Sequence, residues 1–201
     1  LKINQKYLEA ELDKNKAPAS VPVPITKIVV SALSNAQNGN LGGIKGADAK
    51  CQADAQKYNK PGLWRALLGT KSKSVQSFFT GSQASSLKVY NSKNQLMADN
   101  WNAFMKFDTR KQTYFYAFQG RKVDEGTGAS PDWADADMWS GASNSGGTTS
   151  STCNDWTSSS NSYTGCANEV DSTQTFCQET YHKCNENLAV LCVRYGTGQT
   201  T

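Results

Sequence analysis

The sequence predicts an α+β domain that is stapled by disulfide bonds and preceded by a short N-terminal helix. The chain has six cysteines and no CxxC pair, and an even number at uneven spacing indicates disulfides rather than a metal site. It is rich in aromatic residues, with five Trp, eight Tyr and seven Phe, while only 37% of its residues are hydrophobic. This composition is typical of an extracellular β-rich or mixed domain that relies on cross-links.

Residues 1–16 are predicted to form a helix, because Leu1, Leu8 and Leu12 follow a heptad-like spacing. A helix of this length is marginal alone in water, so it needs a partner, which is either its own domain or copies of itself in a bundle. The heptad-like spacing favours an oligomerisation stalk. The alternative is a fraying, tag-like terminus. Residues 17–24 are proline-rich and are expected to form an extended linker that cannot continue the helix.

The globular domain is expected at residues 25–195, with a C-terminal tail at 196–201. The β-branched, apolar segment 25–34 predicts its first strand. Glycine and asparagine dominate residues 35–46, which predicts a loop rich in turns.

A helix is predicted at residues 47–58. Ala47, Cys51 and Ala55 recur there at i, i+4 and i+8 and therefore share one face. This face would bury Cys51 in the core, within reach of a distant strand. The apolar segment 63–68 follows a Pro-Gly pair and predicts a short buried strand.

The remaining elements alternate with polar segments. We expect a loop at 69–82, a strand at 87–90, a helix at 101–107, a strand at 113–118 and a terminal core strand at 188–193. The helix would turn Trp101, Phe104 and Met105 inward. Residues 140–165 are dominated by Gly, Ser, Thr and Asn, and we expect an ordered loop because cysteines and Trp156 anchor it.

The cysteines are distributed unevenly along the chain. Cys51 stands alone, whereas the other five follow from Cys153 onward. Six cysteines allow fifteen pairings, but Cys51 must bridge to the C-terminal group if all six are paired. Because cytosolic thiols stay reduced, these bonds predict a secreted or cell-surface protein.

The charge is also unevenly distributed. Residues 1–125 carry 19 Lys and Arg against 9 Asp and Glu, whereas residues 126–201 carry 2 against 8. The basic residues peak between 62 and 123, and ten of them are candidate ligand-binding residues: Arg65, Lys71, Lys73, Lys88, Lys93, Lys106, Arg110, Lys111, Arg121 and Lys122. Such a polarised domain would attract an anionic partner, and an ordinary solvated surface is the alternative that charge alone leaves open. The interleaved aromatic residues are assigned to the core: Trp64, Tyr90, Trp101 and Tyr114.

No cofactor and no metal are expected. Calcium needs six to eight oxygen ligands, and the nearest candidates, Asp132, Asp135 and Asp137, are interpreted as an acidic loop. His182 is the single histidine and is interpreted as a surface residue rather than a catalytic base. No phosphate-binding loop is present, and no segment approaches the roughly twenty apolar residues of a membrane span.

Six blocks of sequence, taken in order, carry a resemblance to a known family. They are GGIKGADAKCQADAQ (42–56), PGLWRALLG (61–69), QLMADNWNAF (95–104), DMWSGASNSG (137–146), TCNDWTS (152–158) and NLAVLCVR (187–194). Together they resemble the bacterial DUF1554 family, whose fold is similar to endostatin and to C-type lectin-like domains. The resemblance covers roughly residues 25–195 and implies a C-type lectin-like, endostatin-like fold.

The resemblance also implies a disulfide pattern. Endostatin-like domains use two nested bridges, which would here be Cys51–Cys192 outside Cys153–Cys184. Cys166–Cys177 would then be a third, local bridge that the endostatin pattern lacks. The related context of collagen-like bacterial surface adhesins implies a homotrimer, formed through the helix before the domain.

The sequence therefore predicts a non-enzymatic adhesin domain for host-cell attachment, either secreted or on the bacterial surface in association with the outer membrane. It would bind sulfated glycosaminoglycans, such as heparin, or other anionic extracellular glycans without calcium, since no QPD or EPN tripeptide of calcium-dependent lectins occurs. Membrane insertion and specific nucleic-acid binding are not expected. Two alternatives remain: a secreted hydrolase that uses carboxylates near residues 133–139, and a structural cap that trimerises an upstream stalk.

Overall fold

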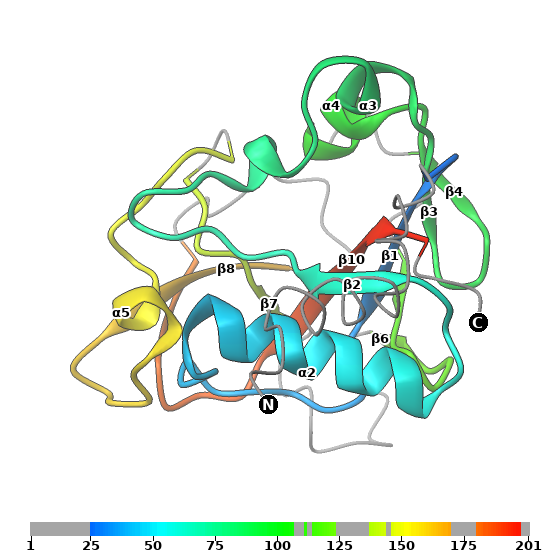
Figure 1. Cartoon of the computed structure of the whole chain (residues 1–201). Coiled ribbons are helices and arrows are strands. Elements are labelled where there is room, and N and C mark those ends of the chain that lie inside the picture. Colours follow the sequence, from blue (N-terminus) through cyan, green and yellow to red (C-terminus); the bar gives the residue numbers. More distant parts are fainter. Residues whose placement is uncertain are drawn as a thin grey trace, which may run out of the picture.

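The computed structural model describes residues 25–106, 111, 114–123, 137–143, 146–169 and 180–197. The predicted N-terminal helix at 1–16 and the linker at 17–24 lie outside these residues. The described residues form one mixed sheet, a small hairpin and several short helices (Figure 1).

Strand β10 (Ala189–Gly196) lies at the centre of the sheet. Strand β1 (Ile28–Ala32) pairs with one of its edges in antiparallel orientation. Its other edge is shared by β2 (Leu63–Ala66), which is antiparallel, and β7 (Asp137–Trp139), which is parallel. Residues 189–193 of β10 are buried on both faces, so this part of the strand is a continuous apolar run rather than an alternating one.

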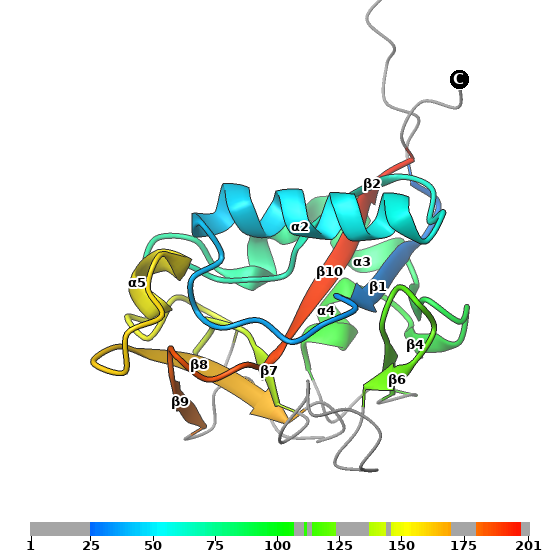
Figure 2. The same ribbon diagram turned by 90° about the horizontal axis from the view of Figure 1, so that it is seen from below.

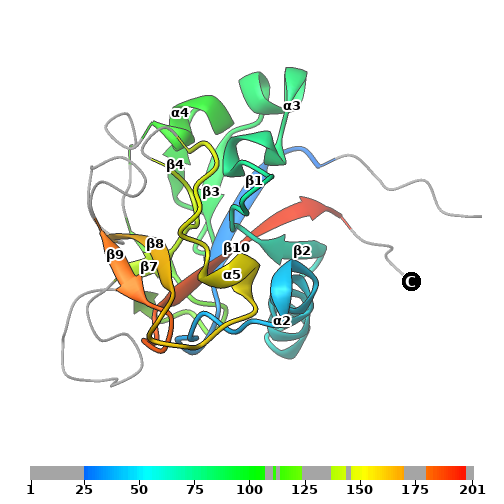
Figure 3. The ribbon, with the colours of Figure 1, turned by 90° about the vertical axis from the view of Figure 1, so that its left-hand side faces the viewer.

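The sheet extends beyond these strands in both directions. Parallel to β1 runs β3 (Val89–Asn91), which pairs in turn with β4 (Leu96–Ala98). Beyond β7 lie β8 (Thr164–Glu169) and β9 (Tyr181–Lys183), and Figure 3 shows these strands on the side of the molecule away from α2.

A separate hairpin packs beside β1 and β3. It consists of β5 (Phe115–Tyr116) and β6 (Lys122–Val123). The hydroxyl groups of Ser31 and Ser92 both donate hydrogen bonds to the carbonyl oxygen of Tyr116. The hairpin is therefore held against the sheet by polar contacts as well as by the buried ring of Phe115.

Helices cover both faces of the central sheet. Helix α2 (Gly43–Lys57) lies across one face, in front of β10 and below β2 in the view of Figure 1. The 3-10 helix η1 (Val75–Phe78) and α4 (Trp101–Met105) pack on the opposite face. Figure 2 shows α4 below β10, on the side away from α2. The helix α3 (Gly81–Ser86) contacts α4, and the single turn α5 (Cys153–Trp156) contacts α2.

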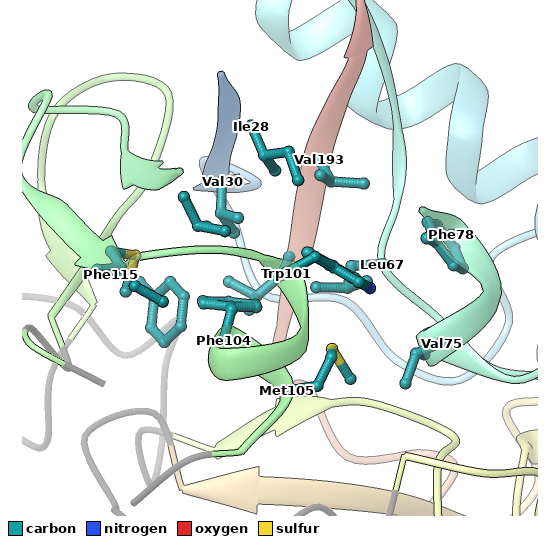
Figure 4. Close-up of a cluster of buried hydrophobic side chains, with 14 of the residues drawn as sticks. Ile28, Val30, Leu67, Val75, Phe78, Trp101, Phe104, Met105, Phe115 and Val193 are labelled. Atoms are coloured by element: carbon teal, nitrogen blue, oxygen red, sulfur yellow. The ribbon is translucent and has the colours of Figure 1, made fainter. Parts of the chain in front are cut away.

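The sheet separates two apolar clusters. On the η1 and α4 face, Ile28 and Val30 of β1 and Val193 of β10 pack against a layer that includes Trp101 and Phe104 (Figure 4). On the α2 face, Val190 and Cys192 of β10 pack against the helix and against Trp139 and Trp156. Successive residues of one strand point to opposite faces, so β10 contributes to both clusters.

Several predicted elements are confirmed. Helix α2 buries Ala47, Cys51 and Ala55, although it begins four residues earlier than predicted. Helix α4 buries Trp101, Phe104 and Met105.

Other expectations about the elements were wrong. The predicted loop at 69–82 contains η1, and α3 begins at its end. Within the predicted strand 113–118 only β5 is strand in the described residues. Strands β4, β7, β8 and β9 were not predicted. The assignment of Tyr90 and Tyr114 to the core was also wrong, because Tyr90 is half-buried and Tyr114 is 40% exposed.

Two disulfide bonds connect the layers. Cys51–Cys192 joins α2 to β10, and Cys153–Cys184 joins α5 to the turn after β9. This is the nested pair that the resemblance implied. Cys166 is buried on β8 and is disulfide-bonded, while its expected partner Cys177 lies outside the described residues. No helix within the described residues is long and apolar enough to span a membrane.

Candidate functional site

The candidate cations do not converge on one face of the domain. Nine of the ten predicted residues lie in the part of the chain that the structure describes, and Arg110 lies outside it. Two groups of basic residues emerge, each built on aromatic rings. One group lies along β2 and η1, and the other lies around the β3–β4 turn and the β5–β6 hairpin.

The first group is centred on the ring of Phe78. The guanidinium carbon of Arg65 lies 4.3 Å from the centroid of this ring, and its Nη2 donates a hydrogen bond of 2.7 Å to the carbonyl oxygen of Phe78. The ammonium group of Lys73 lies 5.5 Å from the same centroid. Tyr195 places a second ring 5.0 Å from the guanidinium. Cation–π contacts therefore orient both positive charges.

Lys71 and Lys73 are held in one tight loop after β2. The amide of Thr70 donates to the carbonyl of Lys73, and the Thr70 hydroxyl accepts from the amide of Lys73. The amide of Lys71 donates to Asp155 Oδ1 at 2.9 Å, which anchors the loop on α5. Both lysine side chains are exposed. We call Arg65, Lys71 and Lys73 the β2–η1 surface.

One carboxylate partly offsets the positive charge of the β2–η1 surface. Asp48 on α2 accepts a hydrogen bond of 2.8 Å from the amide of Ala66. Burial raises the pKa of Asp48, and this is opposed by the hydrogen bond and by the charges of Arg65 and Lys73. Burial lowers the pKa of Arg65, against the attraction of Asp48. The two exposed lysines therefore supply most of the positive charge that a ligand could contact.

The second group consists of lysines that each lie over a tyrosine. Lys122 Nζ is 3.8 Å from the ring centroid of Tyr114, and Lys93 Nζ is 5.8 Å from that of Tyr116. Lys27, which precedes β1, lies 5.1 Å from the ring of Tyr90. We call these three pairs the lysine–tyrosine surface.

Four further candidates lie elsewhere in the described residues. Lys111 forms a salt bridge of 2.6 Å with Asp99, and both side chains are about half exposed. Lys88 and Lys106 are exposed before β3 and after α4, and Arg121 is exposed next to Lys122 in the hairpin.

Comparison with known proteins assigns the chain to a family. Residues 28–197 match the endostatin family model, which is described as "Collagenase NC10 and Endostatin". The chain belongs to the endostatin family. The endostatin-like fold expected from the six sequence blocks is thereby confirmed.

A curated relative of this endostatin-family domain is the human collagen alpha-1(XVIII) chain. The two are 25% identical over 174 residues, which cover 85% of this chain and 10% of the relative. The chain therefore spans about a tenth of that collagen. No enzymatic family is indicated by either comparison.

His182 is the residue of the endostatin-family domain whose environment the sequence predicted least well. It was interpreted as a surface residue, but its side chain is only 15% exposed and lies between two carboxylates. His182 Nε2 is 2.6 Å from Asp137 Oδ2, and Nδ1 is 2.6 Å from Glu186 Oε2. The hydrogen bond to Asp137 is the main cause that raises the pKa of His182 to about 9, against the opposing effect of burial.

This arrangement is unsuitable for general-base catalysis. A histidine with a pKa near 9 is protonated at neutral pH and has both ring nitrogens occupied by carboxylates. Asp137, one of the carboxylates proposed for the hydrolase alternative, is buried and paired with this imidazolium. Asp132 and Asp135 lie outside the described residues. Within the described ranges, no three His, Cys, Asp or Glu side chains are placed to hold a metal ion.

Three basic residues near one cavity were missed by the sequence analysis. Lys27, Lys60 and Arg194 all lie outside the stretch from 62 to 123 that was chosen for its charge density. Arg194 belongs to the acidic C-terminal part and sits in an apolar strand, so composition gave no signal. Only the pairing of β1, β10 and β2 brings these residues together.

Proposed function

We propose that this endostatin-family domain is a non-enzymatic, exported binding module for sulfated glycosaminoglycans or other anionic extracellular glycans. The β2–η1 surface would make the contact, without calcium. The observation that carries the proposal is the rigid placement of exposed Lys71 and Lys73 in one loop, beside Arg65 on its aromatic support.

The loop geometry favours binding because little conformational freedom is lost. Hydrogen bonds from Thr70 and Asp155 already fix the backbone of both lysines, so a ligand needs to order only the side chains. Counterion release from a polyanion would make the affinity strongly dependent on salt, as for other polyelectrolytes. The disulfides support an oxidising compartment, which is where sulfated glycans occur.

The wider context is also part of the proposal. The DUF1554 resemblance suggests a bacterial surface adhesin associated with the outer membrane, in which the domain attaches to host cells. A homotrimer formed through residues 1–16 would add avidity by presenting three copies of the surface. The trimer and the role as a cap of an upstream stalk remain predictions. The hydrolase alternative is weakened by the burial of Asp137 and its pairing with His182.

Heparin affinity chromatography of the full chain tests the proposed surface. The double variant Lys71→Gln/Lys73→Gln removes two exposed charges from the β2–η1 surface. The matched variant Lys93→Gln/Lys122→Gln removes two charges from the lysine–tyrosine surface and has the same net charge as the first variant. We expect the first variant to elute at clearly lower salt than the wild type, and the second to elute close to it.

Two results would contradict this assignment. Equal shifts in both variants would show that retention follows net charge alone. A larger shift in the Lys93→Gln/Lys122→Gln variant would move the binding site to the lysine–tyrosine surface. The salt dependence of heparin affinity adds a second readout, since losing two contacts should lower the slope of log K against log salt concentration by about 2.

A further inference from the structure

A cavity opens on the α2 face of the sheet, at the end of the domain where α2 stops. It has a volume of about 160 Å³, and its lining includes Lys27, Val29, Lys60, Trp64, Asn94 and Arg194. These residues come from β1, β2, β10, the segment after α2 and the β3–β4 turn.

Strand pairing creates the floor of this cavity. Val29 on β1 is the register partner of Arg194 on β10, and Arg194 is the partner of Trp64 on β2. The three side chains therefore form a row across adjacent strands on one face. Val29 and Trp64 belong to the apolar cluster beneath α2, which places this row on the α2 face.

The chain after α2 forms the second wall. Helix α2 ends at Lys57, and Asn59 and Gly62 have positive φ values of 53° and 106° that turn the chain back toward β2. A Cβ at Gly62 would lie 2.6 Å from Cδ of Arg194. Glycine is therefore required where the arginine side chain passes close to the backbone, and Lys60 is held at the rim.

All charged side chains among the described lining residues of the cavity are positive. Lys27, Lys60 and Arg194 contribute three positive charges, and none of the described residues in its lining is a carboxylate. Lys27 is positioned by a hydrogen bond of 2.6 Å from its Nζ to Asn94 Oδ1, which is a neutral acceptor.

Arg194 is the most unusual member of this group. Its Nε is buried and has no hydrogen-bond partner among the described residues. Arg194 as a whole is half-buried, and burial lowers the pKa of its guanidinium. Buried polar atoms in proteins are normally hydrogen-bonded. A half-buried arginine with an unpartnered Nε, in a lining that also includes two lysines, suggests that an anion completes the site.

The size of the cavity limits the anion. Pockets for drug-sized ligands have volumes of about 300–1,000 Å³, whereas one water needs about 10–15 Å³. A volume of 160 Å³ accommodates a single charged substituent with part of the group that carries it. The apolar side chain of Val29 and the indole of Trp64 can contact that carrier.

We propose that Lys27, Lys60 and Arg194 form a pocket for one oxyanion group, a sulfate or a carboxylate. The guanidinium would form charge-assisted hydrogen bonds to the oxyanion and the two lysines would neutralise it at the rim. This site is separate from the β2–η1 surface, because Trp64 and Arg65 are consecutive on β2 and point to opposite faces of the sheet.

Titration of the ¹⁵N-labelled full chain, followed by nuclear magnetic resonance, tests the pocket. Sodium sulfate, sodium acetate and sodium chloride are the three probes, at constant ionic strength. The readout is the indole N–H of Trp64, which donates to the carbonyl of Pro61 at 3.2 Å beside the cavity, assigned with Trp64→Phe. We expect a saturable shift with sulfate, acetate or both, and the stronger of the two identifies the preferred oxyanion.

Variants separate this pocket from the β2–η1 surface. Arg194→Met should weaken the saturable binding by roughly tenfold or more, the loss expected for one charged hydrogen bond. Lys60→Gln changes a residue at the rim and should weaken the saturable binding several-fold without disturbing the core. This variant therefore tests the pocket even if Arg194→Met does not fold. Lys71→Gln/Lys73→Gln should leave the titration unchanged.

The outcomes are distinct from those of the heparin experiment. A linear response, or an equal response to chloride, would overturn the pocket. So would a sulfate titration that Lys60→Gln leaves intact and Lys71→Gln/Lys73→Gln abolishes. Heparin retention does not depend on either result, because it is assigned to Lys71 and Lys73, and neither residue lines the cavity.

Discussion

His182 Nε2 lies 2.6 Å from Asp137 Oδ2, although their strands are not neighbours. Strand β8 runs between β7 and β9, and its Gly165 is the register partner of His182. The ring of Trp139 covers this glycine and meets the imidazole edge-on, with 6.2 Å between the ring centroids. The ion pair therefore ties the outer strand of the sheet directly to the strand beside β10.

This ion pair predicts a loss of stability at alkaline pH. The pKa of His182 is about 9 in the folded state, above the value of about 6.5 for an unfolded chain. Its contribution to the free energy of unfolding is therefore fully present below pH 6.5 and lost as the pH rises through 9. We expect a decrease of about 2–3 kcal/mol across this range, measured by urea denaturation.

The variant His182→Gln is the control for this pH dependence. Glutamine can still donate a hydrogen bond but cannot carry the charge, so the decrease between pH 6.5 and 9 should disappear. An unchanged decrease would show that other groups cause it. At acidic pH the sign reverses for Glu186, because His182 lowers its pKa, and the contribution of Glu186 is lost as the pH falls.

Gly165→Ala is expected to destabilise the fold through packing. A Cβ at this position would lie 2.6 Å from Cζ3 of Trp139 and 2.8 Å from Sγ of Cys153. The expected cost is about 1–3 kcal/mol, typical of overpacking in a core, and thermal unfolding would measure it.

Gly81→Ala is the comparison variant, because a Cβ at Gly81 meets nothing within 4 Å but the φ of this residue is +55°. Its cost should be conformational and about 1 kcal/mol. Equal stability of Gly165→Ala and the wild type would show that the ring of Trp139 can move away.

The two nested disulfides should differ in their effect on stability. The bond Cys51–Cys192 closes a separation of 141 residues, and Cys153–Cys184 closes one of 31. The chain-entropy model predicts losses of about 5 and about 3.5 kcal/mol when each pair is replaced by alanine. Guanidinium denaturation of the two double variants gives the comparison. All four cysteines are fully buried, so a reversed order would indicate that packing rather than chain entropy dominates.

Arg65→Lys should reduce stability while leaving most of the heparin retention. A lysine keeps the positive charge but cannot both stack on Phe78 and reach its carbonyl oxygen in the way that the guanidinium does. We expect a loss of about 1–2 kcal/mol, detected as a lower Tm. The heparin elution should shift much less than in Lys71→Gln/Lys73→Gln. A large shift with unchanged Tm would instead mean that Arg65 contacts the glycan directly.

The sequence predicted those elements in which hydrophobic periodicity is strong. The face of α2 with Ala47, Cys51 and Ala55 was read from helical spacing, and β10 was read from its apolar run. Strand β8 could not be recognised, because its sequence TGCANE is composed of small and polar residues. The large rings of Trp139 and Trp156 belong to the cluster that also buries Ala167 of β8. Packing against these rings requires small side chains on β8, and a sequence of small and polar residues does not indicate a strand.

The candidate binding residues were predicted less well for a different reason. The ten candidates were chosen because they are near in sequence, but the structure divides them between the β2–η1 surface and the lysine–tyrosine surface. Conversely, Lys27 and Arg194 are far apart in sequence and meet only through strand pairing. Charge density along the chain therefore identified the β2–η1 surface but missed the cavity beneath the other face.

The position of β10 has a consequence for biosynthesis. This strand joins β1, β2 and β7, yet all three are translated before it. The sheet cannot close until residues 189–196 have left the ribosome, so the domain must acquire its native topology as a unit, through long-range contacts that form slowly. During this interval Cys51 has no native partner while Cys153, Cys166 and later cysteines emerge. Correct maturation should therefore depend on thiol–disulfide exchange that releases Cys51 from premature bonds before Cys192 arrives.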